Sequence, residues 1–158
     1  MIKSKKGNLF NYFACDHKDL SKNYLNDCKK FFKTLNTNNN KEVNKMGYTN
    51  YWHKYNDFTE SEWKQIKEEF EYIKEAVGFL IEDQSTDTII KFNGVGENGH
   101  EDFYLNKEAR TFKDKMYEGQ DLSFDFCKTN MKPYDIVVWH LLTFINRICP
   151  HFAISRDR

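Results

Sequence analysis

The chain has little proline, little glycine and no net charge. Its 158 residues include 2 Pro and 7 Gly, and its 24 Lys and Arg residues balance 24 Asp and Glu residues. This composition excludes collagen-like and Gly/Pro-rich low-complexity chains. No apolar run approaches the roughly 18 residues that a membrane span requires, so we expect no membrane partner. A chain of this length can bury enough surface to fold without disulfide staples.

The four cysteines lack the spacing of a metal site. No C-x-x-C pair occurs among them: Cys15, Cys28, Cys127 and Cys149. The first six residues, which include three lysines, are not followed by the apolar core of a signal peptide. We therefore expect a cytoplasmic protein with reduced thiols, and the sequence indicates neither a cofactor nor a metal.

The charge is unevenly distributed along the chain. Residues 1–56 carry a net charge of +7 and residues 57–158 a net charge of −7. The two parts are thus expected to attract each other within the fold, whereas nucleic-acid binding through the basic N-terminal part is an alternative that the neutral total does not favour. The aromatic residues 48–55 are expected to pack, with stacking of single-stranded nucleic acid as the alternative.

Apolar residues at helical spacing predict three helices, over residues 20–35, 59–82 and 133–148. The second begins with a capping box, in which Thr59 and Glu62 satisfy each other's backbone amides. The third is apolar around most of its circumference, which predicts a core position, and Pro133 suits its first residue. The Asn-rich residues 36–50 predict a loop.

Alternation of apolar and polar residues predicts strands after residue 87. Residues 88–92 and 101–105 are expected to form a hairpin, and residues 122–127 and 151–155 two further strands. The predicted fold class is α+β, with N-terminal helices and a small, mainly antiparallel sheet packed on the C-terminal core helix. We expect a helical N-terminal part, 1–87, that contains the loop 36–50, and a small α+β domain, 88–158.

The junction between strand 122–127 and helix 133–148 concentrates polar and reactive side chains. With the hairpin loop it forms the candidate binding surface: Cys127, Lys128, Thr129, Lys132, Tyr134, Asp135, Asn93, His100 and Glu101. Lys128 and Lys132 can hold an anionic group near the helix N-terminus. A purely structural explanation is also open, with Cys127 as a buried strand end, Thr129 or Asn130 as a helix cap and Asp135 as a favourable acid in the first helical turn.

Two catalytic alternatives use the same region. Cys127 can act as a nucleophile if a positive charge or a helix N-terminus lowers its pKa. His100 and Asp102 would share a strand face and can ligate a metal if His140 or Asp135 supplies a third ligand.

The glycines of the predicted hairpin loop fit G-x-G-x-x-G, from Gly94 to Gly99. A dinucleotide site requires this motif to open a helix, but here a strand follows it. We therefore interpret the glycines as supplying positive φ angles in a mobile loop.

Four short segments together resemble a family of small proteins from phage and viral genomes. These are Phe126-Cys127-Lys128-Thr129, Lys132-Pro133-Tyr134-Asp135, Phe92-Asn93-Gly94 and Glu101-Asp102-Phe103. The resemblance covers about residues 88–158. Members of that family tend to end in a Ser-Asp-Gly-like turn, whereas this chain ends in Ser155-Arg156-Asp157-Arg158.

The resemblance implies a phage or viral protein in the host-cell cytoplasm, without a transferable activity. The leading hypothesis is a non-enzymatic accessory protein that binds a host protein or a small anionic ligand. The alternatives are a small enzyme that acts on a nucleotide or acyl substrate through Cys127 or the His100/Asp102 site, and the nucleic-acid binding described above.

Overall fold

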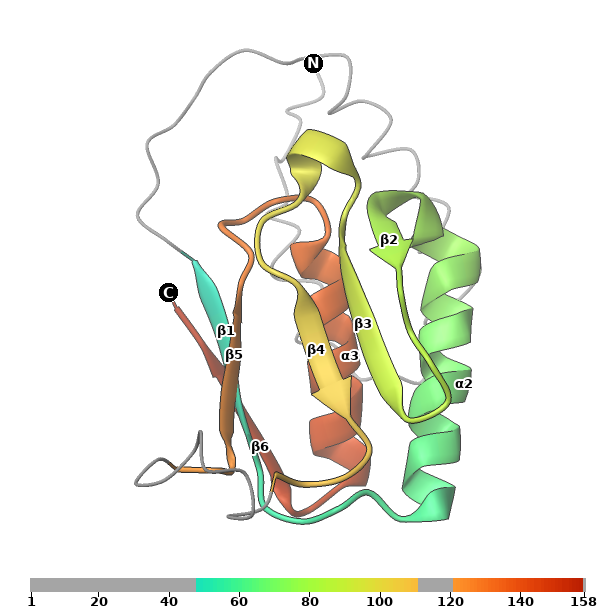
Figure 1. The fold of residues 1–158 in the computed structure, drawn as a ribbon, viewed down its shortest axis with the longest axis vertical. Helices are drawn as coiled ribbons and strands as arrows, with labels where there is room; N and C mark the ends of the chain where they lie inside the picture. Colours follow the sequence, from blue (N-terminus) through green and yellow to red (C-terminus); the bar gives the residue numbers. More distant parts are fainter. Residues whose placement is uncertain (1–47, 111–120, 158) are drawn as a thin grey trace, which may run out of the picture.

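The computed structural model describes residues 48–110 and 121–157 (Figure 1). The predicted helix over residues 20–35, nearly all of the Asn-rich loop, and Cys15 and Cys28 lie outside the described residues. The described chain contains two α-helices and two three-stranded antiparallel sheets. The predicted α+β class is confirmed.

The first sheet has the order β5-β1-β6, with β1 (Thr49–Lys54) between β5 (Phe124–Lys128) and β6 (Phe152–Arg156). The predictions of strands at 122–127 and 151–155 are confirmed to within two residues. Strand β1 was not predicted. It begins inside the predicted loop 36–50 and lies within residues 1–87, which were expected to be helical, so it corrects both predictions. From Asn50 onward its residues alternate between a buried and a partly exposed face, as expected for a strand.

The second sheet has the order β2-β3-β4, formed by β2 (Ile81–Asp83), β3 (Ile89–Gly94) and β4 (Phe103–Asn106). The predicted hairpin is confirmed as β3 and β4, with Phe92 opposite Phe103. Strand β2 takes the place of the last turn of the second predicted helix.

Helix α2 spans Glu60–Val77 and ends five residues before its predicted end. A short 3-10 helix, Gly78–Leu80, follows and leads into β2. Gly78 has a low helix propensity, and Ile81 pairs with Gly94 of β3. Pairing with the neighbouring strand therefore overrides the helical periodicity.

The predicted capping box at the start of α2 is present. The Thr59 hydroxyl accepts a hydrogen bond from the Glu62 amide at 3.2 Å, and the Glu62 carboxylate accepts one from the Thr59 amide at 2.8 Å. These bonds satisfy two backbone donors that the helix itself leaves unpaired.

Replacement of Thr59 by alanine is expected to lower the free energy of unfolding by about 1 kcal/mol, because one of the two capping bonds is lost. Chemical denaturation measures this change. Thr59→Ser keeps the hydroxyl and is the matched control, which should stay within about 0.5 kcal/mol of the parent protein. Equal destabilisation by both replacements would contradict the capping role.

Helix α3 spans Asp135–Ile148 and lies beside α2 (Figure 1). Pro133 precedes it by two residues and belongs to the turn before the helix, so the prediction of Pro133 as the first helical residue is wrong. The predicted core position is confirmed, since Val138, Leu141 and Leu142 are fully buried. None of the helices among the described residues is long and apolar enough to cross a membrane.

One hydrophobic core joins both sheets and both helices. Aromatic rings link the layers: Trp52 of β1 contacts Phe103 of β4 at 5.3 Å, and Phe70 of α2 stacks on Phe92 of β3 at 5.4 Å between centroids. The boundary expected at residue 87 falls in the turn between β2 and β3, and core residues lie on both sides of it.

Candidate functional site

The hairpin loop and the β5–α3 junction are joined by direct hydrogen bonds. Glu101 is the centre of this contact, because its carboxylate accepts from the Lys128 amide at 2.9 Å and its backbone carbonyl accepts from the Tyr134 hydroxyl at 2.7 Å. The Cys127 thiol lies 3.6 Å from the same carbonyl. The structure thus brings these four candidate residues together, through the backbone amide of Lys128 and the side chains of Tyr134 and Cys127.

Asn93 and His100 hold the hairpin loop closed. The Asn93 side chain accepts a hydrogen bond from the His100 amide at 3.0 Å and donates one to the Asp102 carboxylate at 2.8 Å. The His100 ring reaches the Lys128 carbonyl with its Nδ1 atom at 2.8 Å. The Lys132 ammonium donates to the Glu97 carbonyl at 3.1 Å. The contacts of His100 and Lys132 hold the hairpin loop against the end of β5 and the turn before α3.

The prediction that the loop glycines supply positive φ angles is confirmed for Gly96 and wrong for Gly94 and Gly99. Only Gly96 among them has a positive φ, of 54°. A Cβ atom on Gly94 would lie 2.1 Å from the Asn98 carbonyl oxygen, and one on Gly99 would lie 2.8 Å from the Gly94 carbonyl oxygen. Close backbone approach therefore requires glycine at 94 and 99. The chain after Gly99 leads into strand β4, so the geometry of a dinucleotide site is missing from this loop.

Asp135 and Thr129 form the buried end of the junction. The Asp135 carboxylate accepts hydrogen bonds from the Asn50 side-chain amide at 2.7 Å and from the Thr129 hydroxyl at 2.5 Å. The Thr129 amide donates to the Tyr48 carbonyl at 3.0 Å. This carboxylate lies in the first turn of α3, where a negative charge stabilises the helix dipole. It ties the start of α3 to β1.

The turn between β5 and α3 was not predicted. Asn130 and Met131 both have positive φ angles, of 51° and 55°, and the Lys132 amide donates to the Thr129 carbonyl at 3.0 Å. This pattern is that of a type I′ turn, which favours Asn and disfavours Met. Asn130 was the available sequence signal for it.

Cys127 lies in an environment that suppresses nucleophilic reactivity. Its side chain is fully buried. Burial raises the pKa of its thiol from 9.0 to about 12, and the neighbouring carboxylates of Glu101 and Asp135 add to this increase. An activated thiolate requires a lowered pKa. The geometry therefore favours the structural explanation of Cys127.

The contribution of Cys127 to the free energy of unfolding is expected to decrease at alkaline pH. The folded state keeps the thiol proton up to about pH 12, whereas the unfolded chain loses it near pH 9.0. Stability from this group is therefore complete below pH 9.0 and decreases as the pH rises towards 12. Denaturation of the parent protein and of Cys127→Ala from pH 7 to 11 should show a difference that is constant at first and then shrinks by about 2–4 kcal/mol. A difference that does not vary with pH would contradict the shifted pKa.

The predicted metal ligands are engaged elsewhere. The Asp102 carboxylate contacts the Lys91 ammonium at 3.3 Å as well as Asn93. His140 lies on α3, and its ring bonds to Glu69 of α2 at 2.7 Å. The combination of His100 and Asp102 with His140 or Asp135 is not among the metal-type clusters of the described residues.

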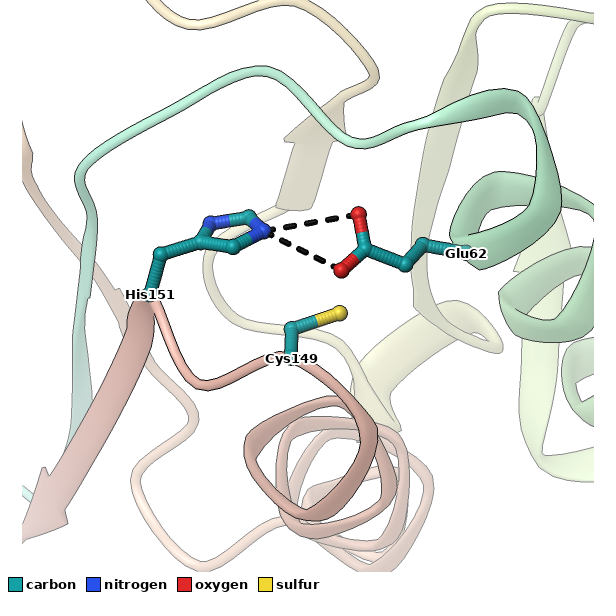
Figure 2. A group of neighbouring side chains, drawn as sticks. All are labelled: Glu62, Cys149 and His151. Carbon is teal, nitrogen blue, oxygen red and sulfur yellow. Dashed lines mark hydrogen bonds and ion pairs between the residues drawn. The ribbon is translucent and has the colours of Figure 1, made fainter.

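A different group of ligand-type side chains comes together at the other end of α3. Glu62, Cys149 and His151 present donor atoms that all lie within 4.8 Å of one another. Figure 2 shows the three side chains pointing toward one another. The His151 Nε2 atom is 3.3 Å and 3.4 Å from the two carboxylate oxygens of Glu62. Sequence reasoning missed this group, because Glu62 had an explanation as a cap and the only signal was the short Cys149-Pro150-His151 spacing.

A second feature is a row of rings on the outer face of the first sheet, here called the aromatic face: Tyr51, His53, Tyr55, Phe124 and Phe126. The His53 and Phe124 rings are 5.3 Å apart, and Phe124 contacts both Tyr51 and Phe126 at 6.1 Å. Tyr55 is 58% exposed and Phe126 is 49% exposed. Of the aromatic residues 48–55, only Tyr48 and Trp52 are buried in the core, whereas Tyr51 packs on Phe124 at the surface and Tyr55 is exposed.

Comparison with known proteins gave no relative for this chain. No protein-family model matches it, and searches of curated proteins and of solved structures found no significant match.

Proposed function

We propose that this protein is a non-enzymatic binding protein that recognises another protein through the aromatic face. The observation that carries the proposal is the exposure of contacting rings on the side of β1 opposite to its buried residues. Exposed apolar patches mark interaction sites, and Tyr and Phe are enriched at protein interfaces. In the phage or viral context that the sequence resemblance implies, the partner would be a host protein.

The surroundings of the aromatic face indicate the chemistry of the partner. A hollow of about 410 Å³ lies between the rings of His53, Phe124 and Phe126 and the charged residues Asp121 and Arg110. The Asp121 side chain is 61% exposed. A polypeptide with an apolar side chain next to a Lys or Arg fits this arrangement, because rings and carboxylates both attract cations.

The charges of this face favour a protein over nucleic acid. Arg110 is paired with Asp125, at 2.5 Å between Nη2 and Oδ2. Asp157 accepts from the Thr49 amide and the Tyr51 hydroxyl at the opposite end of the face. The exposed carboxylate of Asp121 would repel phosphates. Stacking alone is sequence-tolerant, but single-strand binders combine it with a positively charged groove.

The junction supports the alternative of a small anionic ligand less well. The Asp135 carboxylate lies in the first turn of α3, where an added anion would be attracted, and the Lys132 ammonium donates to a carbonyl of the hairpin loop. A ligand would have to compete with both groups. We therefore base the proposed function on the aromatic face.

Photocrosslinking tests the proposal in the full chain. Benzoylphenylalanine at position 126, introduced in the cells where the protein is normally made, is expected to form an adduct with a different protein. Phe79 is the matched control position, because it is 51% exposed and lies on the 3-10 helix Gly78–Leu80. An adduct from position 126 that position 79 does not give identifies the partner.

Purified components complete the test. Tyr55→Ser combined with Phe126→Ser should weaken binding of that partner at least tenfold, whereas Phe79→Ser should leave it unchanged. Equal binding by all variants would contradict the proposal. Adducts to residues 1–47 of the same chain, to a second copy or to nucleic acid would each overturn it and would assign the aromatic face to that occupant.

A further inference from the structure

We propose that Glu62, Cys149 and His151 bind one divalent transition-metal ion, with Zn²⁺ as the ion that matches this ligand set. Thiolate sulfur, imidazole nitrogen and carboxylate oxygen are the three protein donors that zinc takes. The three residues come from different elements: the first turn of α2, the C-cap of α3 and the residue before β6. A bound ion would therefore link the first turn of α2 to the turn between α3 and β6, which is distant from it in sequence.

The donor spacing is close to that of a coordination shell. Zinc–ligand bonds of about 2.0–2.3 Å in a tetrahedron place neighbouring donors roughly 3.3–3.8 Å apart. The His151 Nε2 and Glu62 Oε1 atoms are already 3.3 Å apart. The remaining separations do not exceed 4.8 Å, so side-chain rotation supplies most of the movement that binding requires.

The surrounding structure orients each ligand. The Thr59 amide and hydroxyl donate to the Glu62 carboxylate at 2.8 Å and 3.1 Å. The Phe152 amide donates to the Cys149 carbonyl at 3.1 Å, which closes the turn around Pro150. The His151 carbonyl accepts from the Tyr55 amide at 3.2 Å. Because these hydrogen bonds already restrict the three residues, metal binding costs them little further conformational freedom, which favours affinity.

Burial and charge also favour a cation at this point. Cys149 is fully buried, while Glu62 and His151 keep 16% and 18% of their side chains exposed, which leaves an entry path. A metal ion would replace the proton of the Cys149 thiol and compensate the Glu62 carboxylate at the same time.

Three protein ligands leave a fourth position for water or an external ligand. The affinity has a physical limit, because the buried His151 Nδ1 atom has no hydrogen-bond partner among the described residues. Metal binding through Nε2 places the ring proton on Nδ1, where second-shell acceptors normally hold it, and loss of such a partner costs about 10–100-fold in affinity. We expect binding weaker than in closed sites with four protein ligands.

The full-length protein is first treated with a chelator to remove bound metal. Titration with Zn²⁺ and with Co²⁺ then tests the proposal. The parent protein should bind one equivalent, gain a thiolate-to-cobalt absorption band and unfold at a higher temperature when Zn²⁺ is present. Glu62→Gln, Cys149→Ser and His151→Ala should each weaken binding at least tenfold. The Gln variant keeps the capping geometry, since Gln also serves in a capping box, and so separates ligand loss from loss of folding.

Matched controls come from residues of the same types. His100→Ala and Cys127→Ser should retain the bound equivalent and the cobalt band, because neither residue belongs to the cluster. The proposal is overturned if the parent protein binds no metal, or if Glu62→Gln and Cys149→Ser bind as tightly as the parent. Loss of binding in the controls would assign the metal to other ligands.

Discussion

Replacement of Phe92 by alanine is expected to lower the free energy of unfolding by about 3–5 kcal/mol. Phe92 is fully buried, and its ring stacks on Phe70 at 5.4 Å and on Phe103 at 4.9 Å. Truncation removes both ring contacts and leaves a cavity between α2 and the hairpin. Because most domains are stable by only about 5–15 kcal/mol, the variant should be marginally folded. Urea denaturation and the melting temperature measure the loss.

Two variants make this measurement specific. Phe92→Leu keeps most of the buried volume and should cost less than half as much. Phe79→Ala changes an exposed ring, 51% exposed, and should stay within about 0.5 kcal/mol of the parent protein. A loss below 1 kcal/mol in Phe92→Ala, or an equal loss in Phe79→Ala, would show that the stack does not support the fold in this way.

Replacement of Asp135 by alanine is expected to cost about 2–4 kcal/mol, because the Asn50 amide and the Thr129 hydroxyl lose their shared acceptor. Both donors are fully buried, so water cannot easily replace the carboxylate. The start of α3 also loses the acid in its first turn. Denaturant midpoints with an unchanged slope would report this as a change in stability alone.

Lys128→Ala is the matched control at the same junction. Its side chain is partly exposed, and surface replacements usually stay within about 0.5 kcal/mol. Asp135→Asn keeps one acceptor oxygen and should fall between the other two variants. If Asp135→Ala and Lys128→Ala were equally mild, the buried network would contribute little, and a role of Asp135 in binding would regain support.

Local sequence signals predicted most of the fold where secondary structure depends on nearby residues. The capping box at Thr59 placed the start of α2, because both of its partners lie within four residues. The alternation around Phe92 and Phe103 placed the β3–β4 hairpin. Where pairing with distant residues decides the structure, prediction was wrong or silent. The end of α2 was displaced by the pairing of Ile81 with Gly94, and the central position of β1 depends on partners 71 or more residues away.

The same distinction between local signals and long-range contacts applies to the candidate sites. The sequence identified the junction around Asp135 as a concentration of polar groups, and the structure shows that the side chains of Thr129, Tyr134 and Asp135 are hydrogen-bonded within the protein. The cluster of Glu62, Cys149 and His151 could not be predicted from spacing, since Cys149 lies 87 positions after Glu62. The aromatic face has a partial signal in the alternation of Tyr51, His53 and Tyr55, but its other half comes from β5.

The sequence alone determined the α+β class, the capped start of α2, the apolar helix α3 and the hairpin. Each of these follows from backbone propensity and from burial patterns that repeat within a few residues. Only the tertiary structure decided which polar groups form hydrogen bonds within the junction, which rings face outward and which three ligand-type side chains meet. Those outcomes depend on the register of β1 against β5 and β6 and on the packing of α2 against α3, which join residues that no local pattern connects.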